Sequence, residues 1–114
     1  MRLAAALATV LATLVAPLAH AAEPADLTPL QQQGKKIYLG LCINCHAPGL
    51  WGTTRLAKRM DKDHAVLDNR TDLAPVTIRV AIRVGIGSMP PLRKTEVSDA
   101  DVEAVTAYLT RRRP

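Results

Sequence analysis

The two cysteines of this chain lie in one short stretch, Cys42-Ile43-Asn44-Cys45-His46, in which a histidine directly follows the second thiol. The rest of the sequence offers few bulky side chains for a core, since it contains no phenylalanine, one tryptophan and two tyrosines. Aromatic rings usually contribute much of the buried surface of a small domain, and a domain of this size is only marginally stabilised by its core alone. A bound planar cofactor that fills part of the interior, held by this stretch, is therefore the strongest constraint on the fold.

The Cys-x-x-Cys-His spacing is typical of c-type haem attachment. One helical turn separates Cys42 from Cys45, so both sulfurs can reach the two vinyl groups on one edge of a porphyrin and form thioethers. His46, the next residue, is then carried to the face of the ring, where its Nε2 can ligate iron. The sequence predicts one haem c, attached through Cys42 and Cys45 and ligated by His46.

Three alternatives use the same thiols. A redox dithiol of the thioredoxin kind needs a βαβ context, which the sequence lacks. A structural zinc site needs four ligands, and His64 is the only further candidate of the Cys/His set in the mature chain, so an aspartate would have to complete it. A disulfide between the two cysteines would close a very small loop and add little stability.

A six-coordinate iron needs a second axial ligand, for which the candidates are Met89, Met60, His64 and a lysine. Met89 lies in the stretch GIGSMPPL, where glycines precede it and two prolines stiffen the chain after it. Such a loop, far along the chain from His46, can cross the opposite face of the ring, and we predict Met89 as the ligand. Met60 is interpreted as a side chain that fills an irregular gap, and His64 as a solvated histidine.

The beginning of the sequence has the layout of a secretory signal peptide. An unbroken run of apolar and small residues at 3–16 follows a positively charged start, and small residues at Ala19 and Ala21 end the segment. The run is too short to cross a hydrocarbon core of about 30 Å as a helix. We therefore expect residues 1–21 to be cleaved after about Ala21, leaving 22–114 as a single periplasmic domain with no membrane span.

Both ends of the mature chain carry strong signals for a helix start. Thr28 can cap a helix, Pro29 suits its first position, and Gln31 completes a capping box. Ser98 and Asp101 form a similar signal, a serine that can cap a helix with an acidic residue three positions later. We therefore expect one helix to begin at Thr28 and to run into the Cys-x-x-Cys-His stretch, and another to begin at Ser98.

These terminal helices have apolar stripes at helical spacing, namely Leu30, Gly34, Ile37, Tyr38 and Leu41 in the first and Val102, Val105, Tyr108 and Leu109 in the last. A glycine inside a helix costs about 1 kcal/mol relative to alanine. Gly34 on the buried stripe therefore predicts that a second helix passes close to its backbone, and we expect the two terminal helices to cross there.

A third helix is expected between Asp72 and Gly85, with Asp72 as a possible cap, Pro75 in the first turn and Gly85 as the stop. Because it is apolar nearly all round, apart from Arg79 and Arg83, we expect it to be largely buried.

Shorter helical pieces are expected at about 54–60 and 63–69. The sequence contains no alternating strand pattern and no internal repeat. The predicted fold class is all-α, with three to five helices around one haem.

The mature sequence resembles the class I monohaem cytochromes c over nearly its whole length. The resemblance is carried by three stretches, GKKIYLGLCINCH, GSMPPL and DVEAVTAYLTRR. It implies crossed terminal helices around Gly34, Tyr38, Tyr108 and Leu109, axial ligation by His46 and Met89, and one-electron transfer without catalytic residues. The competing classes are a haem enzyme or sensor with an open sixth position, and a thiol oxidoreductase without haem.

A finer resemblance concerns the second half of the chain. Residues 70–109 are similar to the cytochrome subunits that partner flavoprotein dehydrogenases of the 4-cresol type. In such a pair the flavoprotein oxidises the substrate and the cytochrome takes up electrons one at a time. The resemblance implies a flavoprotein dehydrogenase as donor, with an oxidase or another cytochrome or copper protein as acceptor.

The sequence also departs from the family. Family members often have Gly-Pro-x-Leu after the haem motif, and the proline carbonyl accepts a hydrogen bond from the ligand histidine. Here Thr54 stands where the proline would be, so a carbonyl from Thr54 would have to orient His46. For the haem propionates the candidate partners are Arg59, Arg79 and Arg83.

The chain is basic, with a formal net charge of +5, and three arginines, Arg111 to Arg113, lie near its end. These arginines can be interpreted as the solvated end of a helix, where positive charges interact favourably with the helix dipole. Alternatively, they can form a basic patch that steers the protein to an acidic partner. Nucleic acid is excluded as a partner, since an exported chain with few aromatics carries no recognition motif.

Overall fold

The computed structural model describes residues 27–112. Its elements in chain order are α1 (Pro29–Ile37), the π-helical turn η1 (Tyr38–Cys42), α2 (Ile43–His46), α3 (Trp51–Leu56), α4 (Lys62–Ala65), the 3-10 turn η2 (Leu67–Asn69), α5 (Pro75–Arg83) and α6 (Asp99–Leu109). Within these residues there is no β-strand, only an isolated bridge between Ile86 and Met89. The all-α fold is confirmed, whereas the predicted leader, residues 1–21, lies outside the described residues.

Both terminal helices begin where the sequence predicted. The Gln31 backbone N–H donates to the Thr28 hydroxyl at 3.3 Å, and the Thr28 N–H donates to the Gln31 side chain at 3.0 Å. Ser98 and Asp101 form the same reciprocal pair at the start of α6, at 3.1 and 3.2 Å. These bonds satisfy backbone N–H groups that have no partner inside the helix.

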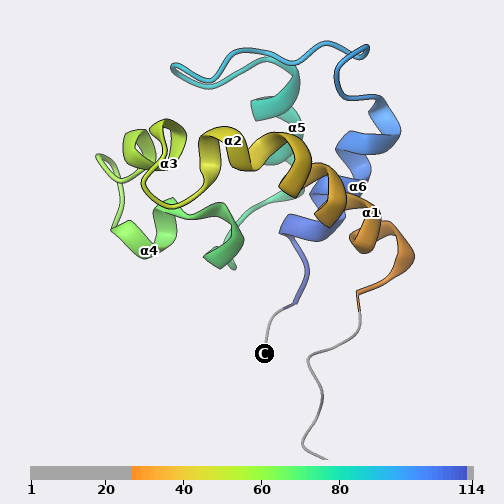
Figure 1. Cartoon of the computed structure of the whole chain (residues 1–114), viewed down its shortest axis with the longest axis horizontal. Coiled ribbons are helices and arrows are strands. Elements are labelled where there is room, and N and C mark those ends of the chain that lie inside the picture. The colour runs from red at the N-terminus through yellow and green to blue at the C-terminus, as the bar shows by residue number, and fades with distance from the viewer. Residues whose placement is uncertain (1–26, 113–114) are drawn as a thin grey trace, which may run out of the picture.

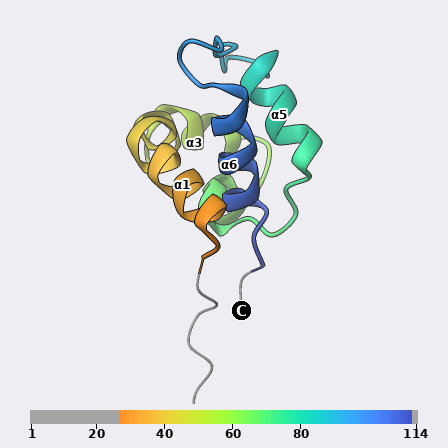
Figure 2. The same ribbon diagram turned by 90° about the vertical axis from the view of Figure 1, so that its right-hand side faces the viewer.

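α1 packs across α6 at Gly34, as Figures 1 and 2 show from two sides. A methyl group built on Gly34 would overlap the carbonyl of Ala104 and lie 2.8 Å from Tyr108 Cβ. The rings of Tyr38 and Tyr108 meet beside this contact, with centroids 5.6 Å apart and planes tilted by 44°. The predicted close approach at Gly34 is therefore confirmed.

The buried stripe of α6 anchors the core. The four residues predicted for this stripe are all buried, together with Tyr38 of η1 and Ile78 and Ile82 of α5. The stripe of α1 is less complete, since Leu30 and Leu41 are 48% and 40% exposed. The core therefore follows α6 and is joined by the middle and end of the α1–η1 segment.

α5 contributes only one face to this core. Ile78 and Ile82 are buried, whereas Val76, Val80 and Val84 are 63%, 42% and 70% exposed. The expectation that this helix is largely buried was wrong for the described chain. When a helix is apolar on all sides, its sequence does not indicate which face packs against a neighbouring element.

The predicted cap of α5 was also wrong. Ala74 is the N-cap and makes no side-chain capping bond. The carboxylate of Asp72 instead accepts two hydrogen bonds from Arg70, at 2.9 and 2.8 Å. The end of the helix is as predicted, since Gly85 has a φ of +81° and donates its N–H to Ala81 at 3.1 Å.

The segment between α2 and α5 is built of short helices. α3 begins at Trp51, before the expected start at 54, because Gly49, with a φ of +80°, turns the chain directly after α2. The second expected piece is divided into α4 and η2. The carboxylate of Asp61 begins α4 by accepting the backbone N–H groups of Asp63 and His64.

The end of the chain folds back onto the domain. Arg111 donates to the Tyr108 carbonyl at 2.6 Å, lies 3.8 Å from the centroid of its ring, and pairs with Asp68 at 2.9 Å. Its side chain is only 15% exposed, so Arg111 is a structural contact and belongs to neither a solvated helix end nor a docking patch. The start of α1 and the end of α6 leave the domain on the same side, opposite the loop that follows α5 (Figures 1 and 2).

Candidate functional site

The two thiols lie where the first helix changes its winding. η1 ends at Cys42 and α2 continues from Ile43 to His46. Cys42 is half-buried, Cys45 is exposed, and both are free. Burial raises the pKa of the Cys42 thiol to about 11, with a smaller contribution from nearby Cys45. A dithiol catalyst needs the opposite shift, because the thiolate is the reactive form.

His46 has the environment of a neutral imidazole. Its ring is half-buried, and burial lowers its pKa, which favours the form that ligates metals. Its Nδ1 is fully buried and has no hydrogen-bond partner among the described residues. The expected bond to the Thr54 carbonyl is therefore not formed. Thr54 is exposed and its hydroxyl donates to the Gly49 carbonyl at 3.3 Å.

α3 packs against the ring of His46. The turn at Gly49 folds α3 back beside α2 (Figure 1). A methyl group built on Gly52 would lie 2.8 Å from the Cys45 carbonyl and 3.2 Å from both Nδ1 and Cε1 of His46. Thr53, the next residue, is 5% exposed and its hydroxyl has no partner among residues 27–112. Sequence reasoning missed both residues, although the Gly-Thr pair so soon after the haem motif was a usable signal.

Met89 is held by a loop of fixed shape. Its N–H donates to the Ile86 carbonyl at 3.0 Å, and the N–H of Leu92 donates to the Ile82 carbonyl at 2.7 Å. A methyl group on Gly85 would overlap the Met89 carbonyl, so the loop lies directly on the end of α5. Met89 is partly buried and packs against the same hydrophobic cluster as Cys42. The fold thus brings the thiol segment and the predicted methionine to one core.

The other candidate ligands have protein partners. Met60 is partly buried, with Nη1 of Arg70 3.9 Å from its sulfur. His64 is exposed, but its Nδ1 lies 2.6 Å from Asp61 Oδ2, so it is paired rather than simply solvated. Among the described residues, no group of three or more His, Cys, Asp or Glu side chains is placed to hold a metal ion.

Two of the three arginines considered for the propionates are engaged in the fold. Arg79 forms a bidentate pair with Glu103 at 2.7 and 2.6 Å. Arg83 donates to the Leu92 and Val97 carbonyls and to Asp99, at 3.1, 2.8 and 2.9 Å. Arg59 makes no ion pair within residues 27–112, and its guanidinium approaches Gly87 in the methionine loop. Of the three arginines, Arg59 is therefore the one whose side chain is most available to pair with a propionate.

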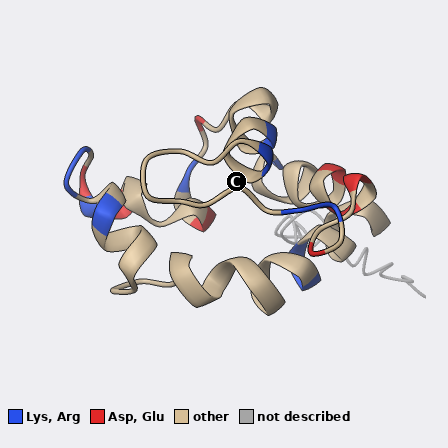
Figure 3. Cartoon of the chain, turned by 90° about the horizontal axis from the view of Figure 1, so that it is seen from above, with Lys and Arg blue, Asp and Glu red and all other residues tan. Residues whose placement is uncertain are grey.

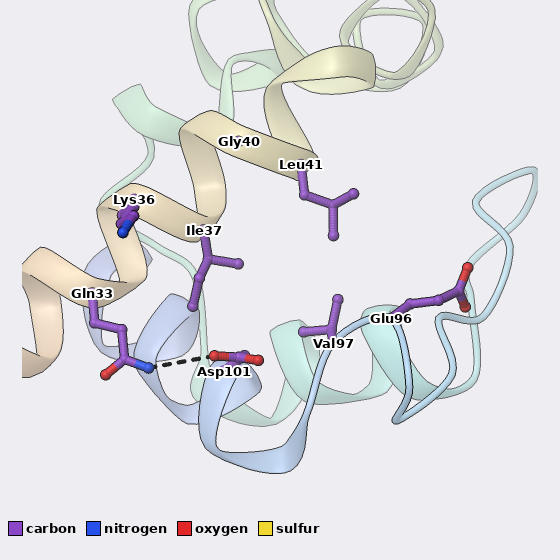
Figure 4. Close-up of a pocket in the computed structure, with 8 residues that line it drawn as sticks. All are labelled: Gln33, Lys36, Ile37, Gly40, Leu41, Glu96, Val97 and Asp101. Atoms are coloured by element: carbon purple, nitrogen blue, oxygen red, sulfur yellow. Dashed lines mark hydrogen bonds between the residues drawn. The ribbon is translucent and has the colours of Figure 1, made fainter.

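An open groove of about 480 Å³ lies between the first helical segment and the start of α6 (Figure 4). It is lined by Gln33, Lys36, Ile37, Gly40, Leu41, Glu96, Val97 and Asp101. Figure 4 shows Gln33 reaching Asp101 across one end, with a hydrogen bond of 3.4 Å. None of the predicted ligands lines it, so this groove is separate from the predicted iron ligands.

The residues present fit a haem. A half-buried imidazole with a lowered pKa and a partly buried thioether are suitable iron ligands, and two free thiols lie one helical turn apart beside the imidazole. Large apolar side chains flank them: Leu50 and Trp51 follow His46 and are 41% and 53% exposed, and Ile86, before Met89, is 45% exposed. Such surfaces suit a planar apolar ring.

An all-α fold with crossed terminal helices and this set of groups defines the class of c-type cytochromes. A family model described as "Cytochrome C oxidase, cbb3-type, subunit III" matches residues 29–109, and the chain belongs to this family. It is therefore an electron-transfer protein that binds haem c. Searches of curated proteins and of solved structures gave no match. Within residues 27–112, the helices are too short or too polar to cross a bilayer.

Proposed function

We propose that this protein is a periplasmic monohaem carrier, with its haem attached through Cys42 and Cys45 and ligated by His46 and Met89. The observation that carries the proposal is the partly buried Met89, fixed on a hydrogen-bonded loop against the same core as Cys42. A single Cys-x-x-Cys-His stretch supports a single haem. The sequence of residues 1–21, which has the layout of an export signal, supports the periplasmic location.

Bound haem supplies a one-electron couple between ferric and ferrous iron. The chain determines how that couple is used. If His46 and Met89 both held the iron, they would leave no open position for small ligands such as oxygen, and the thioether of Met89 would favour the ferrous state.

The ligation is tested by visible spectra of the oxidised and reduced protein, with and without carbon monoxide. A c-type spectrum that carbon monoxide leaves unchanged is expected for the wild type. Met89→Ala should bind carbon monoxide and lose its high reduction potential, whereas the control Met60→Ala should do neither. Carbon monoxide binding to the wild type would favour an enzyme or sensor, and absence of haem bands would favour a thiol oxidoreductase.

The proposed electron donor is a flavoprotein dehydrogenase of the 4-cresol type, and the acceptor an oxidase or another cytochrome or copper protein. The similarity of residues 70–109 supports the donor, and the name of the matched family supports an oxidase as acceptor. Tagged protein from its native host should co-purify with a flavin-containing subunit. Repeated isolation of the cytochrome alone would count against a stable complex with that donor.

A basic segment supports an acidic partner. In the described chain, acidic positions are confined to residues 61–72 and 96–103, whereas basic positions occur in more parts of the fold (Figure 3). In the part of the chain that the structure describes, however, no acid forms an ion pair with Arg55, Lys58, Arg59 or Lys62. This segment adjoins Trp51, which is 53% exposed, with Arg55 5.7 Å from its ring centroid.

Electrostatic association through this segment should weaken as salt is added. Replacing Lys58 and Lys62 with glutamine should slow reduction by the donor at low salt. The same double change at Lys35 and Lys36 on α1 is the control and should have less effect. Equal rates for both double variants would assign no special role to the basic segment.

A further inference from the structure

The backbone of Gly52 lies directly against the imidazole of His46. A methyl group built on Gly52 would lie 3.2 Å from both Nδ1 and Cε1 of the ring and 2.8 Å from the Cys45 carbonyl oxygen. Carbon atoms normally pack about 3.5–4.0 Å apart. Only a residue without a side chain therefore allows α3 to come this close to the ring and to the end of α2.

This contact is the restraint that the structure offers on the edge of the ring that carries Nδ1. A metal-bound histidine is usually oriented by a hydrogen bond from its second ring nitrogen. Here Nδ1 of His46 is buried and has no hydrogen-bond partner among the described residues. If Nε2 binds iron, the ring can still turn about the bond to the metal, and the backbone of Gly52 blocks that rotation on the Nδ1–Cε1 edge.

The backbone on both sides of the contact is held by hydrogen bonds. Across the turn, the N–H of Leu50 donates to the Ala47 carbonyl at 3.0 Å. The N–H of Ala47 donates back to Ile43 at 2.9 Å, and that of Thr54 donates to Leu50 at 2.8 Å. These bonds fix the separation of α2 and α3, whereas the imidazole turns about single bonds. A side chain at position 52 would therefore be accommodated by rotation of the ring.

We propose that Gly52 is a positioning residue, whose lack of a side chain lets α3 pack on the Nδ1–Cε1 edge of His46 and so fixes the plane of the axial imidazole. The inference rests on the proposed ligation by His46. The plane matters because the imidazole overlaps with the iron orbitals in one direction only. That direction determines how the unpaired electron of the ferric state is distributed over the porphyrin.

The test compares Gly52→Ala with Gly40→Ala, both prepared with haem attached. Gly40 is the matched control, because it also lies close to the thiols in sequence and a methyl group there would meet no atom within 4 Å. The measurement is the proton NMR spectrum of the ferric protein, in which the shifts of the haem methyl groups follow the plane of the axial imidazole. Gly52→Ala should change the order of these signals, and Gly40→Ala should keep the wild-type order.

A loss of stability alone would lower the melting temperature of Gly52→Ala without changing the order of the methyl signals. That result would overturn the inference, as would the same reordering in Gly40→Ala.

A second measurement uses the wild type and does not depend on how the variants fold. In the ferrous protein, the α-protons of Gly52 should give a strong nuclear Overhauser effect to the Hε1 proton of His46, and its absence would overturn the inference. The same spectrum tests the ligation separately. If the ring protons of His46 lack the large ring-current shift of a haem ligand, the proposed ligation is wrong and the inference falls with it. If they show that shift without the contact to Gly52, only the role of Gly52 is wrong.

Discussion

The contact between α1 and α6 predicts a large loss of stability for Gly34→Ala. The new methyl group would overlap the Ala104 carbonyl oxygen and lie 2.5 Å from its carbon and 2.8 Å from Tyr108 Cβ. Carbon atoms normally pack about 3.5–4.0 Å apart, so the two helices must separate. Two of the three nearest atoms belong to the backbone and cannot move aside as a flexible side chain would.

Overpacking costs about 1–3 kcal/mol, and a backbone clash belongs at the upper end, about 3 kcal/mol. Alanine returns about 1 kcal/mol of helix propensity. The expected net loss is therefore about 2 kcal/mol, a substantial part of a total stability of about 5–15 kcal/mol. For a domain of this size the melting temperature should fall by roughly 10 °C.

Gly40→Ala is the matched control, because a methyl group there would meet no atom within 4 Å. It should gain about 0.5–1 kcal/mol from propensity alone. Denaturant unfolding of the haem-loaded variants, followed by far-ultraviolet circular dichroism and by haem absorption, measures the difference. The two variants should differ by about 3 kcal/mol. Equal stabilities would refute the reasoning that Gly34 sets the distance between the terminal helices.

Two further predictions concern charged side chains. Arg111→Ala should lower the free energy of unfolding by about 2 kcal/mol, because it removes a largely buried guanidinium that contacts Tyr108. The control Arg112→Ala, at an exposed position, should change this free energy by less than about 0.5 kcal/mol. The same unfolding experiment measures both. The hydrogen bonds from Arg70 lower the pKa of Asp72 from 3.8 to about 2. This pair therefore stabilises the fold at pH values above the ordinary pKa of an aspartate, and its contribution is lost as the pH falls through the pKa that Asp72 has in the folded protein. Acid titration of stability should therefore show a shallower decline for Asp72→Asn between about pH 4 and pH 2, and an unchanged decline would contradict this assignment.

The sequence was most informative where the interaction is local. The boxes at Thr28 and Ser98 join residues three apart, so their spacing alone predicts them. Gly34 was informative for a related reason, since a helix-interior glycine on an apolar stripe needs a compensating neighbour. The identity of that neighbour, Ala104, depends on the register of two helices distant in sequence.

Predictions failed where several partners compete for one group. Asp72 was a reasonable cap by position, but Arg70, two residues away, binds both carboxylate oxygens. Arg111 was interpreted from the charge of its tail, whereas its contacts depend on Asp68, far away in the chain. In both cases the side chain has more than one possible partner, and only the folded arrangement selects between them.

The candidate site was predictable in part for the same reasons. The Cys-x-x-Cys-His spacing is local, and the glycines and prolines around Met89 indicated a fixed loop. The packing of α3 on His46 depends on the left-handed conformation of Gly49, one residue that turns the chain back immediately. Because of this turn, Gly52 and not the expected Thr54 lies beside the imidazole. The ligation of Met89 itself stays a prediction until the spectra are measured.

The exit of both chain ends on one side, opposite the loop that follows α5, has a practical consequence. A linker at either end would tether the domain to an electrode or to a fused enzyme from the same side. Both attachments would leave the Met89 loop directed away from the support. The domain can therefore be immobilised through either terminus with the Met89 loop left facing the solution.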